Sequence, residues 1–386
     1  MRRAEEWEGL KNGKVKEINL ALVMATHFRT LKIGDVRRET AECISVAFTV
    51  PEAFREEFQF FQGQNITLRV RMGEEEVRRS YSICSSPLEG ELRVAIKKVE
   101  GGRFSTWANE RLAPGHELEV LPPSGRFYTE LGPGNRKRYL AFAAGSGITP
   151  VISLIKTTLA VEPESSFTLV YGNRNRLSIL FREELEALKN RYIDRFSLYH
   201  ILSREEMDIP LYRGRIDTEK CAELCGKLIE LSAMDEVFLC GPEQMIFSVK
   251  DWLEGQGVER RKIHFELFHT LDGGGAVRRS VVAEGGATVR HGEVSRVTVR
   301  LDGMSHTFDL PFEGASVLET ALMEGVDLPF ACKGGVCSTC RARLLEGKVE
   351  MDANYALEAD ELAAGFILTC QSHPRSGRVV IDFDSK

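Results

Sequence analysis

The stretch Cys332-Lys333-Gly334-Gly335-Val336-Cys337-Ser338-Thr339-Cys340, with Cys370 further along, decides the fold of the C-terminal region. Its spacing, C-x₄-C-x₂-C and a later fourth cysteine, is typical of four thiolates that hold a [2Fe-2S] cluster. A thioredoxin-like or zinc-binding C-x-x-C would leave Cys332 unexplained. Gly334 and Gly335 suit a chain that needs unusual backbone angles around a compact inorganic core. We therefore predict Cys332, Cys337, Cys340 and Cys370 as cluster ligands.

Patterns around this motif predict a small mixed domain over residues 287–386. Ser295–Leu301 and His306–Leu310 alternate like a hairpin, and Ser316–Glu324 has a helical pattern. Residues 269–286, with three consecutive glycines at Gly273–Gly275, have the composition of a flexible linker.

The middle of the chain, residues 136–268, is predicted to form a doubly wound α/β domain with a parallel sheet. Apolar strands at Tyr139–Ala144, Phe167–Tyr171 and Val237–Cys240 alternate with glycine turns and amphipathic helices. Residues 27–132 instead carry short alternating runs, such as Ile66–Val70, that predict an antiparallel β-barrel. Residues 1–26 are an N-terminal extension.

Composition narrows the class of protein. The chain of 386 residues, 43% hydrophobic and 28% charged, fits two or three globular domains. A net charge of -6 argues against a nucleic acid partner. The apolar run Ile18–Ala25 is too short to span a bilayer, so we predict no membrane association and a cytoplasmic location. Cys221 and Cys225, spaced i, i+4, are interpreted as core or surface residues rather than half of a metal site.

A glycine turn, Gly145-Ser146-Gly147, follows the first strand of the α/β domain and precedes a helix that contains Pro150. By itself it is a tight strand-to-helix turn or a dinucleotide loop. A nicotinamide donates two electrons as hydride, whereas a [2Fe-2S] cluster accepts one, so a flavin is expected between them.

Two segments of the barrel suit that flavin. Arg79-Ser80-Tyr81-Ser82, predicted at the start of a strand, offers a cation, an aromatic ring and hydroxyls. Gly101-Gly102-Arg103-Phe104-Ser105 follows at a predicted helix start, where free backbone N–H groups suit a phosphate. Together they resemble the ferredoxin-NADP reductase superfamily.

That resemblance implies FAD and assigns residue roles. Arg79 would contact the flavin phosphates, Tyr81 would stack on the ring system, and Ser82 would lie near N5; Ser80 would also bind the cofactor. Thr149 would lie near the nicotinamide, and Ser82, Cys240 and Glu266 would serve the reaction itself. The remaining cofactor-binding residues implied are Ile96, Lys97, Gly102, Arg103, Phe104, Ser105, Gly145, Ser146, Gly147, Gly241, Pro242 and Met245.

The choice between NADPH and NADH depends on what meets the adenosine ribose. Ser203-Arg204 resembles the Ser-Arg pair of NADP-using members, and Arg174 supplies a second guanidinium, so we predict NADPH over NADH. The alternative is that Arg174, Arg176 and Arg204 are solvated loop charges.

The order of flavin, nicotinamide and C-terminal β-grasp ferredoxin domains resembles reductase components of bacterial oxygenases. Stretches such as Val99–Ser105, Tyr171–Arg174 and Asn354–Gly365 resemble the reductase-subunit family of phenylacetyl-CoA epoxidases, over residues 24–386. The resemblance implies electron delivery to the di-iron oxygenase of a multi-subunit epoxidase complex in phenylacetate catabolism. A reductase for another hydroxylase, or a non-catalytic redox sensor, is the alternative. The extension has no counterpart in that family, so we expect translation to start at Met24 rather than Met1.

Overall fold

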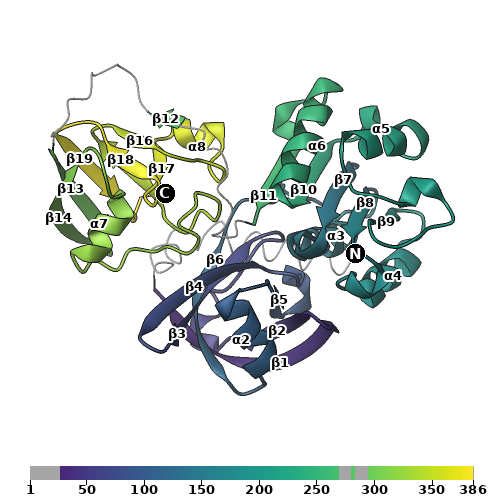
Figure 1. Cartoon of the computed structure of the whole chain (residues 1–386), viewed down its shortest axis with the longest axis horizontal. Helices are drawn as coiled ribbons and strands as arrows, with labels where there is room; N and C mark the ends of the chain where they lie inside the picture. Colours follow the sequence, from purple (N-terminus) through teal and green to yellow (C-terminus); the bar gives the residue numbers. More distant parts are fainter. Residues whose placement is uncertain (1–26, 269–279, 283–293, 386) are drawn as a thin grey trace. The chain divides into compact units, whose positions relative to one another are not determined.

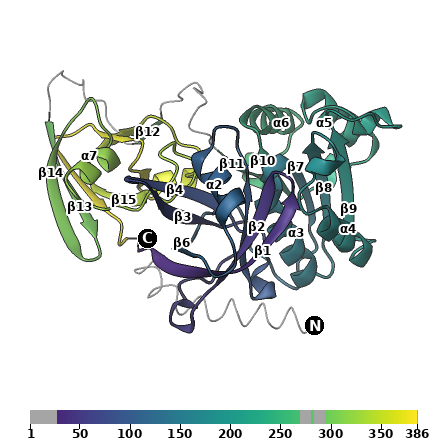
Figure 2. The same cartoon turned by 60° about the horizontal axis from the view of Figure 1, so that its bottom comes forward.

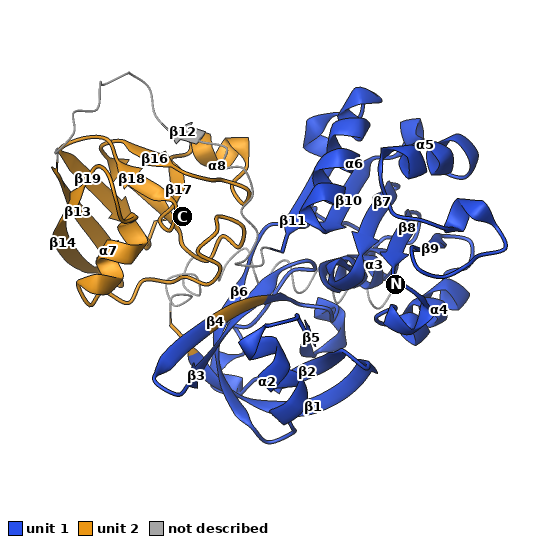
Figure 3. Cartoon of the chain, viewed as in Figure 1, with its two compact units in different colours: residues 1–18, 29–77, 81–268 blue, residues 19–28, 78–80, 269–386 orange. Residues whose placement is uncertain are grey.

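The computed structural model describes residues 27–268, 280–282 and 294–385, in two compact units (Figures 1 and 3). Unit 1 comprises Arg29–Val77 and Tyr81–Phe268; unit 2 comprises Arg78–Ser80 and the chain beyond Phe268, with residues 27–28. The N-terminal extension, the proposed start at Met24 and all of the linker except 280–282 lie outside the described residues. The domain boundaries stay predictions. In the described residues no helix is long and apolar enough to cross a membrane.

The first part of unit 1 is the expected barrel. Its strands pair in the order β4-β3-β6-β1-β2-β5 within residues 29–124. An isolated antiparallel bridge between Ile83 and Val94 joins the end of β4 to β5, which brings the two edges of the sheet together. The strands are β1 (Arg29–Thr40), β2 (Cys43–Thr49), β3 (Asn65–Met72), β4 (Glu75–Ser82), β5 (Leu92–Lys97) and β6 (Glu117–Ser124).

One prediction about the barrel is wrong. Arg79-Ser80-Tyr81-Ser82 ends β4 instead of starting a strand. The reason is a two-residue turn, Gly73-Glu74, with Gly73 at φ 72°, which allows β4 to begin at Glu75 in a run of charged residues. The exposed glutamates at the beginning of β4 lack the apolar–polar alternation by which a strand is recognised in the sequence.

The second part of unit 1 confirms the doubly wound fold. Its parallel sheet, within residues 138–267, has the order β11-β10-β7-β8-β9. Helices α3 and α4 cover one face and α5 and α6 the other (Figure 2). The elements are β7 (Arg138–Ala144), α3 (Ile148–Val161), β8 (Ser166–Asn173), α4 (Arg182–Arg191), β9 (Phe196–Leu202), α5 (Thr218–Lys227), β10 (Glu236–Gly241), α6 (Glu243–Gly255) and β11 (Ile263–Leu267).

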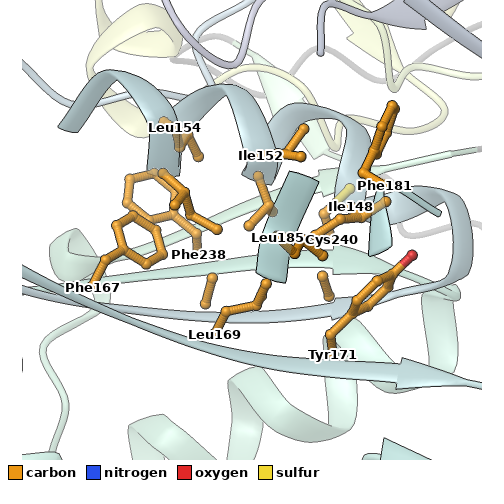
Figure 4. Close-up of a cluster of buried hydrophobic side chains, with 14 of the residues drawn as sticks. Ile148, Ile152, Leu154, Phe167, Leu169, Tyr171, Phe181, Leu185, Phe238 and Cys240 are labelled. Atoms are coloured by element: carbon orange, nitrogen blue, oxygen red, sulfur yellow. The ribbon is translucent and has the colours of Figure 1, made fainter. Parts of the chain in front are cut away.

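Helix α3 packs on the centre of this sheet. Ile148 and Ile152 of α3 belong to the same buried cluster as Phe167, Tyr171 and Cys240 of the strands (Figure 4). Because side chains of a strand alternate between the two faces of the sheet, Cys240 and the residue two positions before it on β10 both point toward α3. This packing fixes where α3 begins relative to the end of β10.

A buried carboxylate holds the connection between barrel and sheet. Glu162, at the end of α3, is fully buried and accepts hydrogen bonds from Tyr139 Oη (2.9 Å) and Ser165 Oγ (2.7 Å). It also accepts from Gly132 N and Asn135 Nδ2 of the connecting segment. The segment is thereby tied to the α/β part despite its glycines.

The described part of unit 2 is an α+β fold, as predicted. Its main sheet has the order β14-β13-β19-β15-β17, in which β13 and β19 are parallel, and α7 packs on the same core. The predicted hairpin and helix are confirmed by β13, β14 and α7. The elements are β12 (Ser280–Val282), β13 (Val294–Leu301), β14 (Met304–Pro311), α7 (Val317–Met323), β15 (Arg341–Glu346), β16 (Val349–Met351), α8 (Ala359–Ala363), β17 (Phe366–Leu368), β18 (Ser372–Pro374) and β19 (Arg378–Asp382).

Candidate flavin, nicotinamide and iron-sulfur sites

The strand order of the parallel sheet reverses between β7 and β10. Ligands of open α/β sheets bind outside the carboxyl ends of the strands at such a switch point. The Gly145–Gly147 turn follows β7, and Cys240-Gly241 ends β10, so both predicted nicotinamide segments meet there.

The turn and the strand end approach each other too closely for a side chain. A Cβ atom on Gly147 would lie 2.1 Å from the carbonyl oxygen of Cys240. On Gly241 it would lie 3.2 Å from Ala144. Glycine at 147 is therefore required by the close approach of two backbones, beyond any need to make a turn.

Three residues predicted to serve the reaction come together from distant parts of the sequence. Ser82 Oγ, at the end of β4, donates a 2.9 Å hydrogen bond to Glu266 Oε2 on β11. Cys240 lies opposite Glu266 in the parallel register of β10 and β11. We call Ser82, Cys240 and Glu266 the polar trio.

The thiol of the polar trio is held neutral. Cys240 is fully buried, and burial, reinforced by the nearby Glu266 carboxylate, raises the pKa of its thiol well above the usual value. A protonated, inaccessible thiol is suited to shaping a pocket and not to nucleophilic attack.

The predicted flavin residues of the barrel include half-buried and fully buried ones. Arg79 and Tyr81 are half-buried on β4, and the Tyr81 ring lies 5.7 Å from that of Phe104, centroid to centroid. Phe104 and Ile96 are in the barrel core. Phe104 therefore packs against the Tyr81 ring from the core side and supports it. The buried Ile96 side chain leaves only its backbone for a cofactor contact, and its carbonyl oxygen already accepts a hydrogen bond from Asn109 Nδ2.

Helix α2 (Arg103–Arg111) begins where the sequence predicts a phosphate site. Its N-cap, Gly102, has no side chain to accept from the first amides, which leaves those donors available to a phosphate. Ser105 Oγ accepts from Val99 N at 3.0 Å and thereby closes the turn, while Arg103 is ion-paired with Glu75.

Lys97 links the two parts of unit 1 at the predicted cofactor positions. It ends β5, and its Nζ lies 3.8 Å from the position a Cβ would take on Gly145. A lysine ammonium therefore stands beside the glycine turn, where it would attract an anionic group.

The predicted ribose-phosphate residues lie side by side. Backbone bonds from Ser203 N to Asn173 O (2.9 Å) and from Arg204 N to Arg174 O (2.8 Å) join the ends of β8 and β9. Both arginines are exposed, and no ion pair joins either to a carboxylate in the described part of the chain. Arg176 differs, since Glu205 binds its guanidinium at 2.6 Å.

The other predicted nicotinamide residues lie near the carboxyl ends of β7 and β10. Thr149 Oγ1 donates to Ser146 O at 3.0 Å, which secures the start of α3. Pro242 caps α6, and Met245 packs its methyl group against Gly241.

The cysteine loop of unit 2 brings the four predicted ligands together in two pairs. The Cys337 side chain, together with burial, raises the pKa of the Cys332 thiol, and the Cys370 side chain and burial likewise raise that of Cys340. Gly334 N donates to Cys332 Sγ at 3.3 Å. The donor set, four thiols arranged as two neighbouring pairs, fits a [2Fe-2S] group.

The unusual backbone angles of this loop are only partly where the sequence predicts them. Positive φ occurs at Gly335 (75°) but also at Lys333 (51°) and Ser338 (56°). Non-glycine residues in the left-handed region are held there by their surroundings, commonly at functional sites. Here they turn the chain around the sulfurs.

Side chains outside the ligand set also contact the sulfurs. Gln371 Nε2 lies 3.6 Å from Cys370 Sγ and donates to Lys333 O at 2.9 Å, which ties the two ends of the loop together. The side chains of Cys332 and Thr339 lower the pKa of the Cys337 thiol to about 6. Sequence spacing predicted the four ligands but missed these donors, although Gln371 directly follows a predicted ligand.

Known families match all three parts. The oxidoreductase FAD-binding domain matches residues 24–128, the oxidoreductase NAD-binding domain residues 142–251, and the 2Fe-2S iron-sulfur cluster binding domain residues 299–375. The chain is 45% identical to a component of the 1,2-phenylacetyl-CoA epoxidase of Escherichia coli (strain K12), over 94% of this chain and 99% of that protein. The chain belongs to the ferredoxin-NADP reductase type of oxidoreductases with a ferredoxin domain. This reductase is an electron-transfer component that serves oxygenases, with domains for FAD and a [2Fe-2S] cluster.

Further relatives agree with that class. The reductase is 33% identical to the ferredoxin reductase component of 3-ketosteroid-9-alpha-monooxygenase from Rhodococcus rhodochrous, over 92% of this chain and 96% of the relative. Its fold resembles phthalate dioxygenase reductase, with a TM-score of 0.54 and 24% identity, over 92% of this chain and 98% of that chain. An intact type IV self-sufficient cytochrome P450 monooxygenase gives 0.63 and 21% over 92% of this chain, which spans 41% of that longer protein.

Proposed function

We propose that this reductase takes electrons from NADPH and delivers them singly to the di-iron oxygenase of a phenylacetyl-CoA epoxidase complex. Bound FAD would accept hydride, and the bound cluster would carry one electron at a time. The similarity to the epoxidase component along nearly the whole chain supports the partner. Backbone hydrogen bonds between the ends of β8 and β9 bring Arg174 and Arg204 together, and this supports NADPH as the nucleotide.

The residues of the polar trio have separate tasks in this proposal. The Ser82–Glu266 bond, 2.9 Å long, can move a proton between the flavin edge and the carboxylate. Cys240 fills the space beside the nicotinamide as a neutral thiol, which shapes the pocket without adding charge. Arg79, Tyr81 and the start of α2 would hold the flavin.

The preference for NADPH is carried by Arg174 and Arg204. Their backbones are bonded at the ends of neighbouring strands, and their guanidinium groups are exposed with no carboxylate partner among the described residues. An unneutralised guanidinium pair suits the 2′-phosphate of NADPH, whereas a ribose hydroxyl would be served better by a carboxylate.

The test compares variants of these arginines. We expect Arg174→Ala with Arg204→Ala to raise the KM for NADPH at least about tenfold, because a charge-assisted hydrogen bond is worth about 1.5–3 kcal/mol. The KM for NADH should stay unchanged. Arg176→Ala is the matched control, because Glu205 already neutralises that arginine. Equal use of both nucleotides by the wild type would refute NADPH preference.

The partner is tested by reconstitution. Purified epoxidase oxygenase subunits, the reductase and NADPH should convert phenylacetyl-CoA, with nucleotide consumption matched to product. Conversion only with another oxygenase, such as a steroid hydroxylase, would make this a reductase of that system. Absence of NAD(P)H turnover with ferricyanide would instead favour a redox sensor.

A further inference from the structure

We propose that a buried polar seam between α3 and the barrel sets the nicotinamide ring against the flavin, and that its hydroxyls are positioning residues for hydride transfer. The seam consists of Ser85 and Ser86, from the loop after β4, and Ser153 and Thr157, from α3. The inference rests on the proposed hydride transfer in unit 1.

Two direct hydrogen bonds cross the seam. Ser153 Oγ donates to the carbonyl oxygen of Ser85 at 2.6 Å. Ser86 Oγ lies 2.9 Å from Thr157 Oγ1. All four residues are at most 3% exposed, so water does not compete for these groups. Ser153 and Thr157 also lie four residues apart on α3, and Thr157 donates back to Ser153 O.

A lysine reinforces the edge of the seam. Lys156 Nζ lies 3.1 Å from Glu89 of the barrel loop and 2.6 Å from Glu184 of α4. Glu89 in turn accepts from Ser86 N at 2.8 Å. The loop is therefore held in one conformation on its own side while it is bonded to α3 on the other.

The seam is connected covalently to both predicted reaction partners. Thr149, Ser153 and Thr157 follow one another at four-residue steps, about 6 Å each along the helix, on the same side of α3. Thr149 is the predicted nicotinamide contact, and Ser85 comes three residues after Ser82 of the polar trio. A slide of α3 along the seam would therefore displace the nicotinamide loop relative to Ser82.

Hydroxyl groups restrict that slide in a way that apolar packing cannot. Methyl groups pack almost equally well at several offsets, whereas a buried hydroxyl loses its partner once it moves by a fraction of a bond length. An orphaned buried hydroxyl costs the full desolvation of that group. One offset satisfies both bonds, so the seam selects a single placement of α3.

The test removes the hydroxyls and measures hydride transfer directly. In anaerobic stopped-flow experiments at saturating NADPH, Ser153→Ala with Thr157→Val should slow flavin reduction about tenfold to a hundredfold, the loss expected for a misplacement near 1 Å. It should also weaken the long-wavelength absorbance of the nucleotide–flavin complex. The dissociation constant for NADPH and the FAD content should stay unchanged.

Two variants separate positioning from stability. Thr158→Val is the matched control, because Thr158 is equally buried but turned about 100° around α3; its rate should stay within about twofold while its Tm falls comparably. Thr157→Ser keeps the hydroxyl and should restore the rate lost in Thr157→Val.

Several outcomes would overturn the inference. One is a seam variant whose flavin reduction stays within twofold of wild type despite a lowered Tm. If the double variant does not retain FAD, Thr157→Val and Thr157→Ser are measured instead, and equal rates for those two overturn it. A wild type whose flavin neither NADPH nor NADH reduces would refute the proposed function itself, before the seam is in question.

Discussion

The cluster loop of unit 2 and the polar trio of unit 1 are assembled in opposite ways. Three of the four cluster thiols come from one nine-residue stretch, Cys332–Cys340. The polar trio comes from three strands, and its hydrogen bond joins residues 184 positions apart. One site depends on the angles of a single turn, and the other depends on the register of a whole sheet against a barrel.

This difference predicts how each site fails. A local site is lost when one ligand is removed, while the surrounding fold remains. An assembled site keeps its residues but loses their alignment when a distant contact changes. The following experiments test that contrast.

The largest expected effect is on the cluster. Cys337→Ser should lose the cluster absorbance and nearly all cytochrome c reduction, because one-electron output depends on four thiolates. Ferricyanide reduction by NADPH should persist, because the polar trio lies in unit 1. Cys225→Ser, on α5, is the control. Intact cytochrome c reduction in Cys337→Ser would disprove the proposed electron route.

Glu266→Gln should have the next largest effect. The amide oxygen still accepts from Ser82, but the side chain no longer exchanges a proton, so turnover should fall about a hundredfold, as for other lost general acids or bases. Turnover against pH is the measurement, and the part of the profile due to this carboxyl should disappear. A rate within twofold of wild type at every pH would remove Glu266 from the mechanism.

Alkylation should distinguish the two sets of thiols. In cluster-free protein at pH 8, iodoacetamide should modify Cys332 at least about tenfold faster than Cys240, because Cys332 is half-exposed whereas Cys240 is fully buried with the proton held on its thiol. Above pH 9 the unfolded chain releases this proton first, so the raised pKa makes stability fall with rising pH. Peptide mapping by mass spectrometry reports the rates; equal labelling would contradict the buried position of Cys240.

Gln371→Leu should have the smallest effect. It removes a donor to Cys370 Sγ, and donors to cluster sulfurs favour the more negative reduced state. We expect a lower reduction potential with the cluster retained, measured by a redox titration followed by EPR. Gln371→Asn is the conservative comparison. An unchanged potential would leave Gln371 with only its bond to Lys333 O.

The sequence predicted what is encoded locally. Cysteine spacing predicted the cluster ligands, and apolar runs around glycine turns predicted the α/β order. Resemblance to a family supplied Ser82, Cys240 and Glu266, whose convergence no local pattern contains. The strand that carries Arg79 was misplaced, because two glutamates open it, and Phe104 turned out to lie in the core.

Long-range contacts could not be predicted. From the sequence alone, Ser153 and Thr157 are ordinary polar residues of an amphipathic helix. Their hydrogen-bond partners are known only once the barrel loop is placed against α3. The 3.8 Å approach of Lys97 to the Gly145 turn likewise depends on how two sheets pack. Periodicity carries information about one element at a time, and these contacts join two.

Glu162 changes how the connector between the barrel and the parallel sheet should be regarded. Gly132-Pro133-Gly134 has the composition of a hinge, yet Gly132 and Asn135 donate to a carboxylate that is fully buried in the α/β part. Opening the connector would remove two of the four donors to that buried carboxylate, so local opening is costly. The flavin and nicotinamide halves of unit 1 should therefore melt as one cooperative unit, and a protease should find no early cleavage site between them.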